Sequence, residues 1–146
     1  MTGILRLSEA SIIAFHAMLH VVRASGRTVT SHEIAVTYHL SEAHIAKIMQ
    51  RLVRAGYLSS VRGPGGGFTA TKAPDTITLR EIYELIEGPL SNTTCFLDTQ
   101  VCGGGENCIF GGLVGKLTGM IDSYMTNTTL AEAVRLSPEQ ERFHEA

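Results

Sequence analysis

The apolar residues in the first half of the chain recur with the period of an α-helix, and helix-starting and helix-ending residues divide them into separate segments. Ser8 is suited to cap a helix over about residues 9–25, which Gly26 would end. Ser41 is suited to cap a later helix that runs to about Ala55. The apolar positions of these two helices and of a shorter one between them are Ile12, Ile13, Phe15, Leu19, Val22, Ile34, Ala35, Ile45, Ile48, Leu52 and Val53.

The short middle helix and the helix after it form a pair with a tight connection. Thr30 and Glu33 have the spacing of a capping box, in which the Glu33 carboxylate reaches back to the Thr30 backbone. A short helix joined by about three residues to a longer one matches the helix-turn-helix pattern. A helix hairpin inside an unrelated bundle would share the apolar pattern, but it would not need hydrogen-bond donors along the outward face of the second helix. Those donors are His44, Lys47, Gln50, Arg51 and Arg54.

Two short strands follow this second helix. The pattern predicts strands at Tyr57–Arg62 and Phe68–Lys72, joined by a glycine-rich turn at Gly63–Gly67. A hairpin directly after a recognition helix would act as a wing. Its glycines, Gly65 and Gly66 among them, would let the tip approach a sugar–phosphate backbone, and Arg62 would enter a narrow minor groove. A nucleotide phosphate loop is excluded, because no Gly-Lys-Ser/Thr follows and no helix opens there.

The pattern after the hairpin predicts one more helix in the same compact unit. Thr78 and Glu81 form a second capping box, and the helix runs to about Glu87, where Gly88 and Pro89 stop it. The sequence therefore predicts a mainly α fold with a small β-hairpin wing, a winged helix-turn-helix followed by a long C-terminal helix. We expect a DNA-binding domain over residues 1–90, a cysteine segment over 91–108, a dimerisation helix with a short terminal helix over 109–136, and a polar tail over 137–146.

The C-terminal helix is predicted from about Cys108 to Met125, and one face of it is suited to dimerisation. Gly111, Gly115 and Gly119 recur every fourth residue beside that face, and three helical glycines indicate that another backbone comes close. The partner is either the same helix of a second subunit, which we favour, or the helix's own domain. The apolar seam is spaced three, four, three and four residues apart, as in a coiled coil, and consists of Phe110, Leu113, Leu117, Met120 and Tyr124.

Charge changes the picture, because the net charge of −2 hides an asymmetry. Residues 1–74 carry eight basic and three acidic residues, a balance of +5, whereas residues 75–146 carry four and eleven, a balance of −7. The stretch from Ala43 to Pro74 has five basic residues and no acidic one. This is the charge pattern of a polyanion-binding surface, although a solvated basic helix face would have the same composition.

All three cysteines lie within fourteen residues, at Cys95, Cys102 and Cys108, with three consecutive glycines among them. The odd number argues against a simple disulfide framework, and thiols on a polar, flexible stretch indicate a site for a soft metal or a cluster. A buried apolar group of cysteines is the alternative. Spacings of seven and six positions do not match a zinc knuckle or a Cys-x-x-Cys redox motif, so they do not identify the metal.

The wing sequence from Gly56 to Phe68, the recognition helix, the three cysteines and the last helix together resemble the winged-helix iron–sulphur transcription regulators of the IscR and NsrR family. The resemblance covers nearly the whole chain. It implies a homodimer that binds a double-stranded DNA operator and holds a 2Fe–2S or 4Fe–4S cluster on its three cysteines. By matching position, it places DNA contacts at Ser41, His44, Lys47 and Arg62. Ala46 stands where IscR has an acidic selectivity residue, so the operator sequence cannot be copied from IscR.

The resemblance fails at the fourth cluster ligand. IscR-like proteins have a histidine three residues after the last cysteine, where this chain has Gly111. NsrR-like proteins use an acidic residue on the first helix of the partner subunit, where this chain has Ile12. Within one helical turn of that position, His16 or Glu9 of the partner subunit could supply the ligand. An exchangeable or solvent ligand is an equal alternative.

These observations predict a non-enzymatic transcription regulator, a repressor, whose DNA affinity responds to redox state, nitric oxide or iron through its cluster. The alternatives are a cluster-free regulator that senses thiol oxidation and a small thiol oxidoreductase or metal-transfer protein. The sequence has no stretch of about 18 apolar residues that would span a membrane. Unpaired cysteines without an export signal lead us to expect a cytoplasmic protein.

Overall fold

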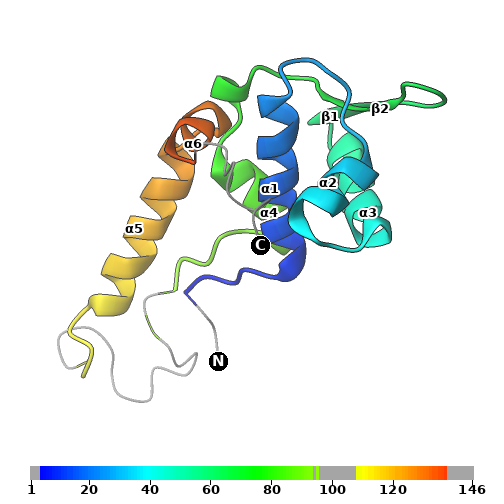
Figure 1. Ribbon diagram of the computed structural model, residues 1–146. Helices are drawn as coiled ribbons and strands as arrows, with labels where there is room; N and C mark the ends of the chain where they lie inside the picture. Colours follow the sequence, from blue (N-terminus) through cyan, green and yellow to red (C-terminus); the bar gives the residue numbers. More distant parts are fainter. Residues whose placement is uncertain (1–3, 94, 96–107, 138–146) are drawn as a thin grey trace, which may run out of the picture.

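The computed structural model describes residues 4–93, 95 and 108–137, and Figure 1 shows their arrangement. The helices and strands of this part confirm the predicted fold class, mainly α with a small two-stranded wing. They are α1 (Glu9–Arg23), α2 (Ser31–Tyr38), α3 (Glu42–Arg54), β1 (Leu58–Val61), β2 (Gly67–Ala70), the 3₁₀ turn η1 (Pro74–Thr76), α4 (Leu79–Glu87), α5 (Leu113–Asn127) and α6 (Leu130–Leu136).

Helix α1 lies at the centre of a compact head and contacts α3, α4, α6 and β2. Its buried face carries Ile13, Ala17 and Met18, none of them more than 2% exposed. The Ser8 hydroxyl caps the helix by accepting a bond from the Ser11 N–H at 3.2 Å. The helix ends at Arg23, slightly before the predicted end. The rest of the core comes from α2, α3, α4, α6, the two strands and segments next to them, and includes Val29, Ile34, Ile45, Leu52, Leu58, Phe68, Ile77, Ile82 and Leu130.

The helix-turn-helix prediction is confirmed at α2 and α3. The turn between them begins at His39, which adopts a left-handed conformation (φ 55°, ψ 45°) that ends α2. Thr30 caps α2 by accepting a bond from the Glu33 N–H at 3.0 Å. The second half of the predicted capping box is wrong, because the Glu33 carboxylate instead accepts bonds from Arg27 at 2.7 and 3.0 Å and contacts His20 at 3.0 Å.

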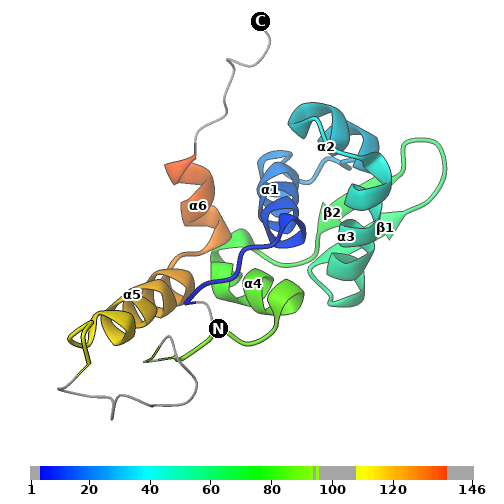
Figure 2. The same ribbon diagram turned by 90° about the horizontal axis from the view of Figure 1, so that it is seen from below.

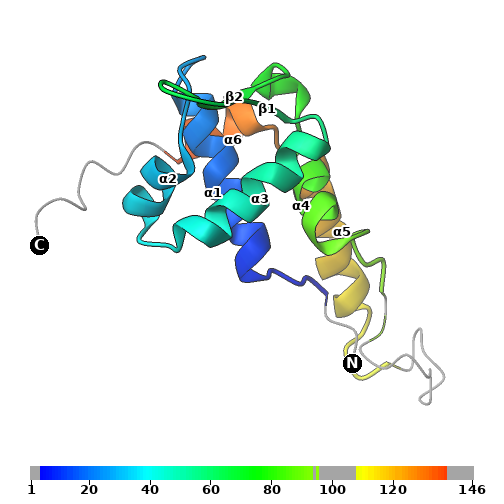
Figure 3. The same ribbon diagram turned by 90° about the vertical axis from the view of Figure 1, so that its right-hand side faces the viewer.

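The wing is an antiparallel pair in which Leu58 faces Ala70 and Val61 faces Gly67. Strand β2 is hydrogen-bonded to the segment before α2, since Val29 and Phe68 exchange backbone hydrogen bonds of 2.9 and 2.8 Å. The wing therefore emerges beside the helix-turn-helix, as a winged helix requires (Figure 3). Figure 3 also shows α4 on the other side of α3 from α2.

Helix α5 extends from the head as an arm (Figures 1 and 2). The predicted start at Cys108 is wrong, because Gly111 (φ 51°) and Gly112 (φ 76°) are left-handed and α5 begins at Leu113. Phe110 and Gly111 consequently precede the helix. None of the helices within the described residues combines the length and the apolar character that a membrane crossing needs.

The end of the arm returns to the head at the start of α4. The Leu79 N–H donates to the Thr128 carbonyl at 2.9 Å, and the Leu130 N–H donates to the Ile77 carbonyl at 2.8 Å. Leu130 is fully buried in the head. At α4, the predicted capping box between Thr78 and Glu81 is present in full.

Candidate nucleic-acid interface and cysteine site

Helix α3 has one face in the core and one face toward solvent. Its buried residues are Ile45, Ile48, Met49 and Leu52. On the other face Lys47 and Gln50 are exposed and His44 is half-buried. The structure thus leaves these three predicted contact residues accessible on one helix of the helix-turn-helix.

Ser41 differs from the other hydroxyl-bearing N-caps of the described helices. The side chains of Ser8, Thr30, Thr78 and Thr129 each accept a capping bond, whereas that of Ser41 accepts none and is exposed. The N-terminus of a helix attracts anions through its backbone N–H groups and its dipole. A hydroxyl not engaged in capping at this place is suited to bind a phosphate or a base edge.

Arg51, which helical periodicity placed on the outward face of α3, makes bonds to a neighbouring helix. Its Nη2 donates to the carbonyl oxygens of Leu85 at 2.6 Å and Ile86 at 3.3 Å, in the last turn of α4. The Arg51 side chain is exposed as well as bonded to α4, so its expected contact with DNA stays a prediction.

The wing tip exposes Arg62 and Gly65 together. Gly65 is left-handed (φ 73°) with open space around it, so a second backbone can come close. Gly66 has a steric role inside the turn, because a Cβ there would lie 2.3 Å from the Val61 carbonyl oxygen. Sequence analysis did not single out Gly67, where a Cβ would lie 2.7 Å from the Val29 oxygen at the point where the wing meets the head.

Further basic side chains surround the wing and the end of α3. Arg54 and Lys72 are exposed, and the Lys72 Nζ lies 4.7 Å from the centre of the Tyr57 ring. Burial, followed by the charge of Glu81, raises the pKa of the Tyr57 phenol, which stays neutral near pH 7. The basic stretch predicted from the sequence thus lies on α3 and the wing.

The described part of the cysteine site lies beside the N-terminal half of α5, at the end of the helix that points away from the head (Figure 1). Cys95 and Cys108 are both half-buried, while Cys102 lies outside the described residues. The Thr93 hydroxyl donates to the Cys95 carbonyl at 2.6 Å, and the buried Thr118 hydroxyl of α5 lies 2.9 Å from the Thr93 carbonyl.

The other end of the cysteine segment runs into the turn before α5. The Gly111 N–H donates to the Cys108 carbonyl at 2.8 Å, within the turn that leads into the helix. One flank is therefore bonded to α5 itself, and the other forms the turn that leads into α5. Among the residues that the structure describes, no three His, Cys, Asp or Glu side chains gather as a metal site. Two described thiols at one end of a helix, with a third in the segment between them, are of the ligand type that iron–sulphur clusters use.

His16 and Glu9 are both exposed on α1, on either side of Ile12. The His16 Nδ1 lies 2.8 Å from the Ile12 carbonyl oxygen, which leaves Nε2 as its ligating atom. His20, one turn on, is mostly buried and contacts Glu33, as expected for an ordinary structural histidine. Hydrogen bonding by Arg27 lowers the pKa of Glu33 to about 2, so this network is anionic at its carboxylate over the physiological range.

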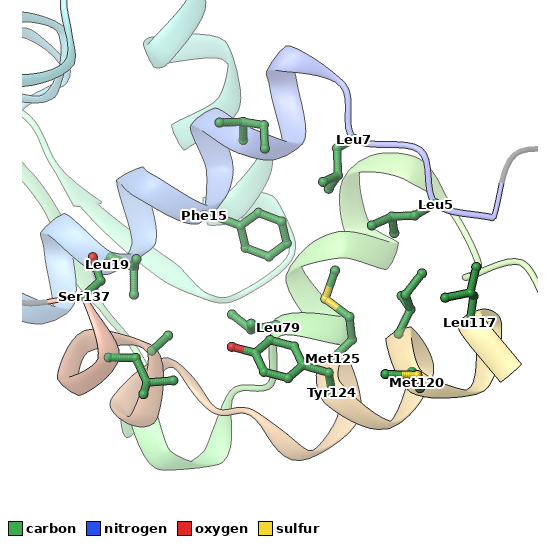
Figure 4. A pocket seen from close by; sticks show the side chains of 14 residues that line it. Leu5, Leu7, Phe15, Leu19, Leu79, Leu117, Met120, Tyr124, Met125 and Ser137 are labelled. Atoms are coloured by element: carbon green, nitrogen blue, oxygen red, sulfur yellow. The ribbon is translucent and has the colours of Figure 1, made fainter.

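An apolar groove of about 700 Å³ lies between α1, α5 and α6 (Figure 4). Three of the predicted dimer residues, Leu117, Met120 and Tyr124, line it together with residues of α1 such as Phe15 and Leu19. Phe110 and Leu113, the other two predicted seam residues, are about half exposed but lie outside the groove lining. The remaining lining residues are Leu5, Leu7, Ile12, Leu79, Ile121, Met125, Ala133, Leu136 and Ser137.

Known proteins with similar sequences are transcription regulators. The chain is 32% identical over 131 residues to the HTH-type transcriptional regulator IscR of Erwinia tasmaniensis, covering 89% of this chain and 79% of that protein. It is 37% identical over 83 residues to a putative HTH-type transcriptional regulator, BadM, of Rhodopseudomonas palustris, covering 57% of this chain but only 53% of BadM.

Solved structures with the same fold include two named regulators. CymR, the global cysteine regulator of B. subtilis, superposes with a TM-score of 0.77 at 24% identity, over 92% of this chain and 99% of CymR. IscR of T. potens superposes with a TM-score of 0.69 at 22% identity, over 94% of this chain and 91% of that chain. At these identities the likeness shows the fold.

A family match covers nearly all of the described residues. Residues 7–136 match the Rrf2 family, whose description is "Iron-dependent Transcriptional regulator". The relatives are regulators and not enzymes, in agreement with the sequence analysis. With a helix-turn-helix, a wing and a match of this length, the chain belongs to the Rrf2 family of DNA-binding transcriptional regulators.

Proposed function

We propose that this regulator is a homodimer, acting as a repressor, whose affinity for its operator is set by an iron–sulphur cluster held on Cys95, Cys102 and Cys108. The observation that carries the proposal is that the cysteine segment meets α5 at both flanks: Thr118 of α5 bonds the Thr93 carbonyl, and Cys108 lies in the turn that leads into the helix. A change at the thiols would therefore act directly on α5, the helix that lines one side of the apolar groove. The iron-dependence in the family description supports the same conclusion.

The DNA-facing part of the proposal uses α3 and the wing. Two subunits would present their α3 helices to successive major grooves, about 34–36 Å apart. Lys47 would contact phosphate, and Arg62 would enter the minor groove, where its charge is attracted. Ser41, His44 and Gln50 would contact base edges or phosphates, with Gly65 and Gly66 forming the wing tip.

The dimer would form when the α5 helix of a second copy packs into the groove between α1, α5 and α6. Leu117, Met120 and Tyr124 are 37%, 69% and 56% exposed in the single chain, which is unusual for large apolar side chains on one helix face. Their burial against a second copy would remove this apolar surface from water. The same packing would bring α1 of one subunit, with His16 and Glu9, toward α5 of the other.

When bound, a 2Fe–2S or 4Fe–4S cluster would supply redox chemistry and reactivity toward nitric oxide at the cysteine segment. The chain's own part is to hold it with three thiolates and to orient the flanks through Thr93 and Thr118. His16 or Glu9 of the partner subunit, or an exchangeable ligand, would complete the coordination. We propose the reducing cytoplasm as the place of action, since unpaired thiols persist there.

A second candidate function is a regulator that responds to oxidation of the thiols themselves, without a cluster. The half-buried state of Cys95 and Cys108 favours it, because both are partly accessible to an oxidant. The fold likeness to CymR, named a cysteine regulator and also solved in an oxidized form in Staphylococcus aureus, is compatible with it.

Anaerobic purification separates the two candidates. The cluster proposal expects a coloured protein with iron and sulphide bound, a Cys102→Ala variant that loses both, and an operator affinity that differs between the loaded and cluster-free proteins. A colourless protein whose operator affinity changes on treatment with a thiol oxidant would establish the second candidate instead. Equal operator affinity in the loaded and cluster-free states would refute cluster control.

A further inference from the structure

The C-terminal end of α4 lacks the usual partners for its last carbonyl groups. The final four carbonyls of a helix have no partner within it. Here the Gly88 N–H reaches the Glu84 carbonyl at 3.0 Å, but Pro89 has no N–H, and the Leu90 N–H donates to the Glu84 side chain at 3.3 Å. The last turn also has no basic residue of its own. The carbonyls that follow Glu84 therefore depend on a donor from elsewhere.

Arg51 of α3 is that donor. One guanidinium nitrogen bonds the Leu85 carbonyl at 2.6 Å and the Ile86 carbonyl at 3.3 Å. A positive charge at this place also meets the negative end of the α4 dipole. The contact therefore fits both the hydrogen bonding and the charge of the helix end, and it links α3 to the end of α4.

The opposite end of α4 is held to the arm. Arg80, in the first turn of α4, donates to Asp122 of α5 at 2.6 Å and to Glu84 at 2.9 Å. Helix α4 is thus attached at one end to the recognition helix and at the other to the arm that carries the cysteine flanks. The direction in which α3 faces DNA is accordingly set relative to α4 and α5.

We propose that Arg51 is a positioning residue that fixes the recognition helix α3 to the C-terminus of α4, and that it does not contact DNA. The proposal rests on the proposed use of α3 to read the operator. It gives Arg51 a role different from that of Lys47, which carries the same charge one turn earlier on the same helix. Both side chains are exposed, but Arg51 also donates to carbonyl groups of α4.

The test compares Arg51→Gln with Lys47→Gln in the full-length protein. An operator is first selected from a random duplex pool with the wild-type protein, and affinities for it and for an unrelated duplex are then measured over a series of salt concentrations. Loss of a phosphate contact in Lys47→Gln should lower the salt slope by about 0.9 per contact and weaken both duplexes alike. Arg51→Gln should keep the wild-type slope and weaken the operator about tenfold relative to the unrelated duplex. Arg51→Lys, which keeps the positive charge and a donor nitrogen, should recover part of that loss.

Two outcomes overturn the proposal: a salt slope in Arg51→Gln that falls as it does in Lys47→Gln, or an operator affinity equal to that of the wild type. If the wild-type protein selects no sequence, the proposed operator reading fails by itself. The attachment is then decided without DNA, because Arg51→Gln should melt about 2–4 °C below Lys47→Gln. Equal melting temperatures would overturn the attachment as well.

Discussion

Met120 provides a quantitative test of the proposed dimer. The side chain lines the groove and is 69% exposed in the single chain. Full burial of a methionine contributes roughly 1.5–3 kcal/mol, so covering the exposed part would contribute roughly 1–2 kcal/mol. Met120→Ala keeps only the Cβ and should lose about 1 kcal/mol per subunit. A symmetric dimer contains the contact twice, so the dissociation constant should rise about 30-fold.

Sedimentation equilibrium over a range of protein concentrations measures that constant directly. Val36→Ala is a matched control, because Val36 is 58% exposed on α2 and lies outside the groove. The control should dimerise like the wild type, and neither substitution should change the melting temperature of the monomer, since exposed substitutions cost little. A wild-type protein that stays monomeric, or a Met120→Ala dimer as tight as the control, would refute the assignment of the groove.

Three further predictions concern the wing, acid stability and the cysteine flank. In Gly66→Ala a Cβ would lie 2.3 Å from the Val61 carbonyl oxygen, so the wing should open and operator affinity should fall. Gly65→Ala adds only about 1–2 kcal/mol of strain from its left-handed conformation, and titration of operator DNA with both variants compares the two effects. The pKa of Glu33 is lowered from 4.5 to about 2, so the stability that this carboxylate contributes is complete above pH 4.5 and is lost as pH falls toward 2. In Glu33→Gln the melting temperature should therefore depend less on pH between 4.5 and 2, and an unchanged pH dependence would contradict the ion pair. Thr118→Val removes a buried hydroxyl that bonds the cysteine segment to α5, so it should destabilise the protein by about 1 kcal/mol and speed alkylation of Cys95; equal alkylation rates would show that the bond does not hold the flank.

Features that depend on local chemistry could be predicted from the sequence. Ser8, Thr30 and Thr78 start helices because a hydroxyl oxygen accepts an N–H two or three residues ahead, and that requirement is visible in the sequence itself. The hairpin between Gly56 and Lys72 was equally visible, since its turn needs glycines in conformations that other residues avoid. These elements define the winged helix-turn-helix.

The start of α5 was not predictable from periodicity. Phe110 continues the three-and-four spacing of the seam, so the pattern extended the helix backward to Cys108. Two adjacent glycines in left-handed conformations, Gly111 and Gly112, instead break the helix before Leu113. Glycine permits both conformations, and the turn that closes on Cys108 decides between them.

Arg51 and Glu33 show a second limit. Both occupy positions where local rules give them a role, one on the outward face of a helix and the other in a capping box. Each has a tertiary partner that the local rule does not show: Arg51 donates to a carbonyl group of α4, and Glu33 accepts from Arg27 in place of its capping bond. Which polar group lies nearby in space cannot be read from spacing along the chain.

The chain leaves and rejoins the head at the two ends of α4, and this decides how far the segment between them can vary. The segment from Gly88 to Asn127 leaves the head at one end of α4 and rejoins it at Leu79, through the Thr128 carbonyl, so its two ends are separated by little more than the length of a nine-residue helix, about 14 Å. Doubling the length of a flexible connection between fixed ends costs only about 0.6 kcal/mol. The number and spacing of the cysteines in this segment can therefore vary at little cost to the folding of the head.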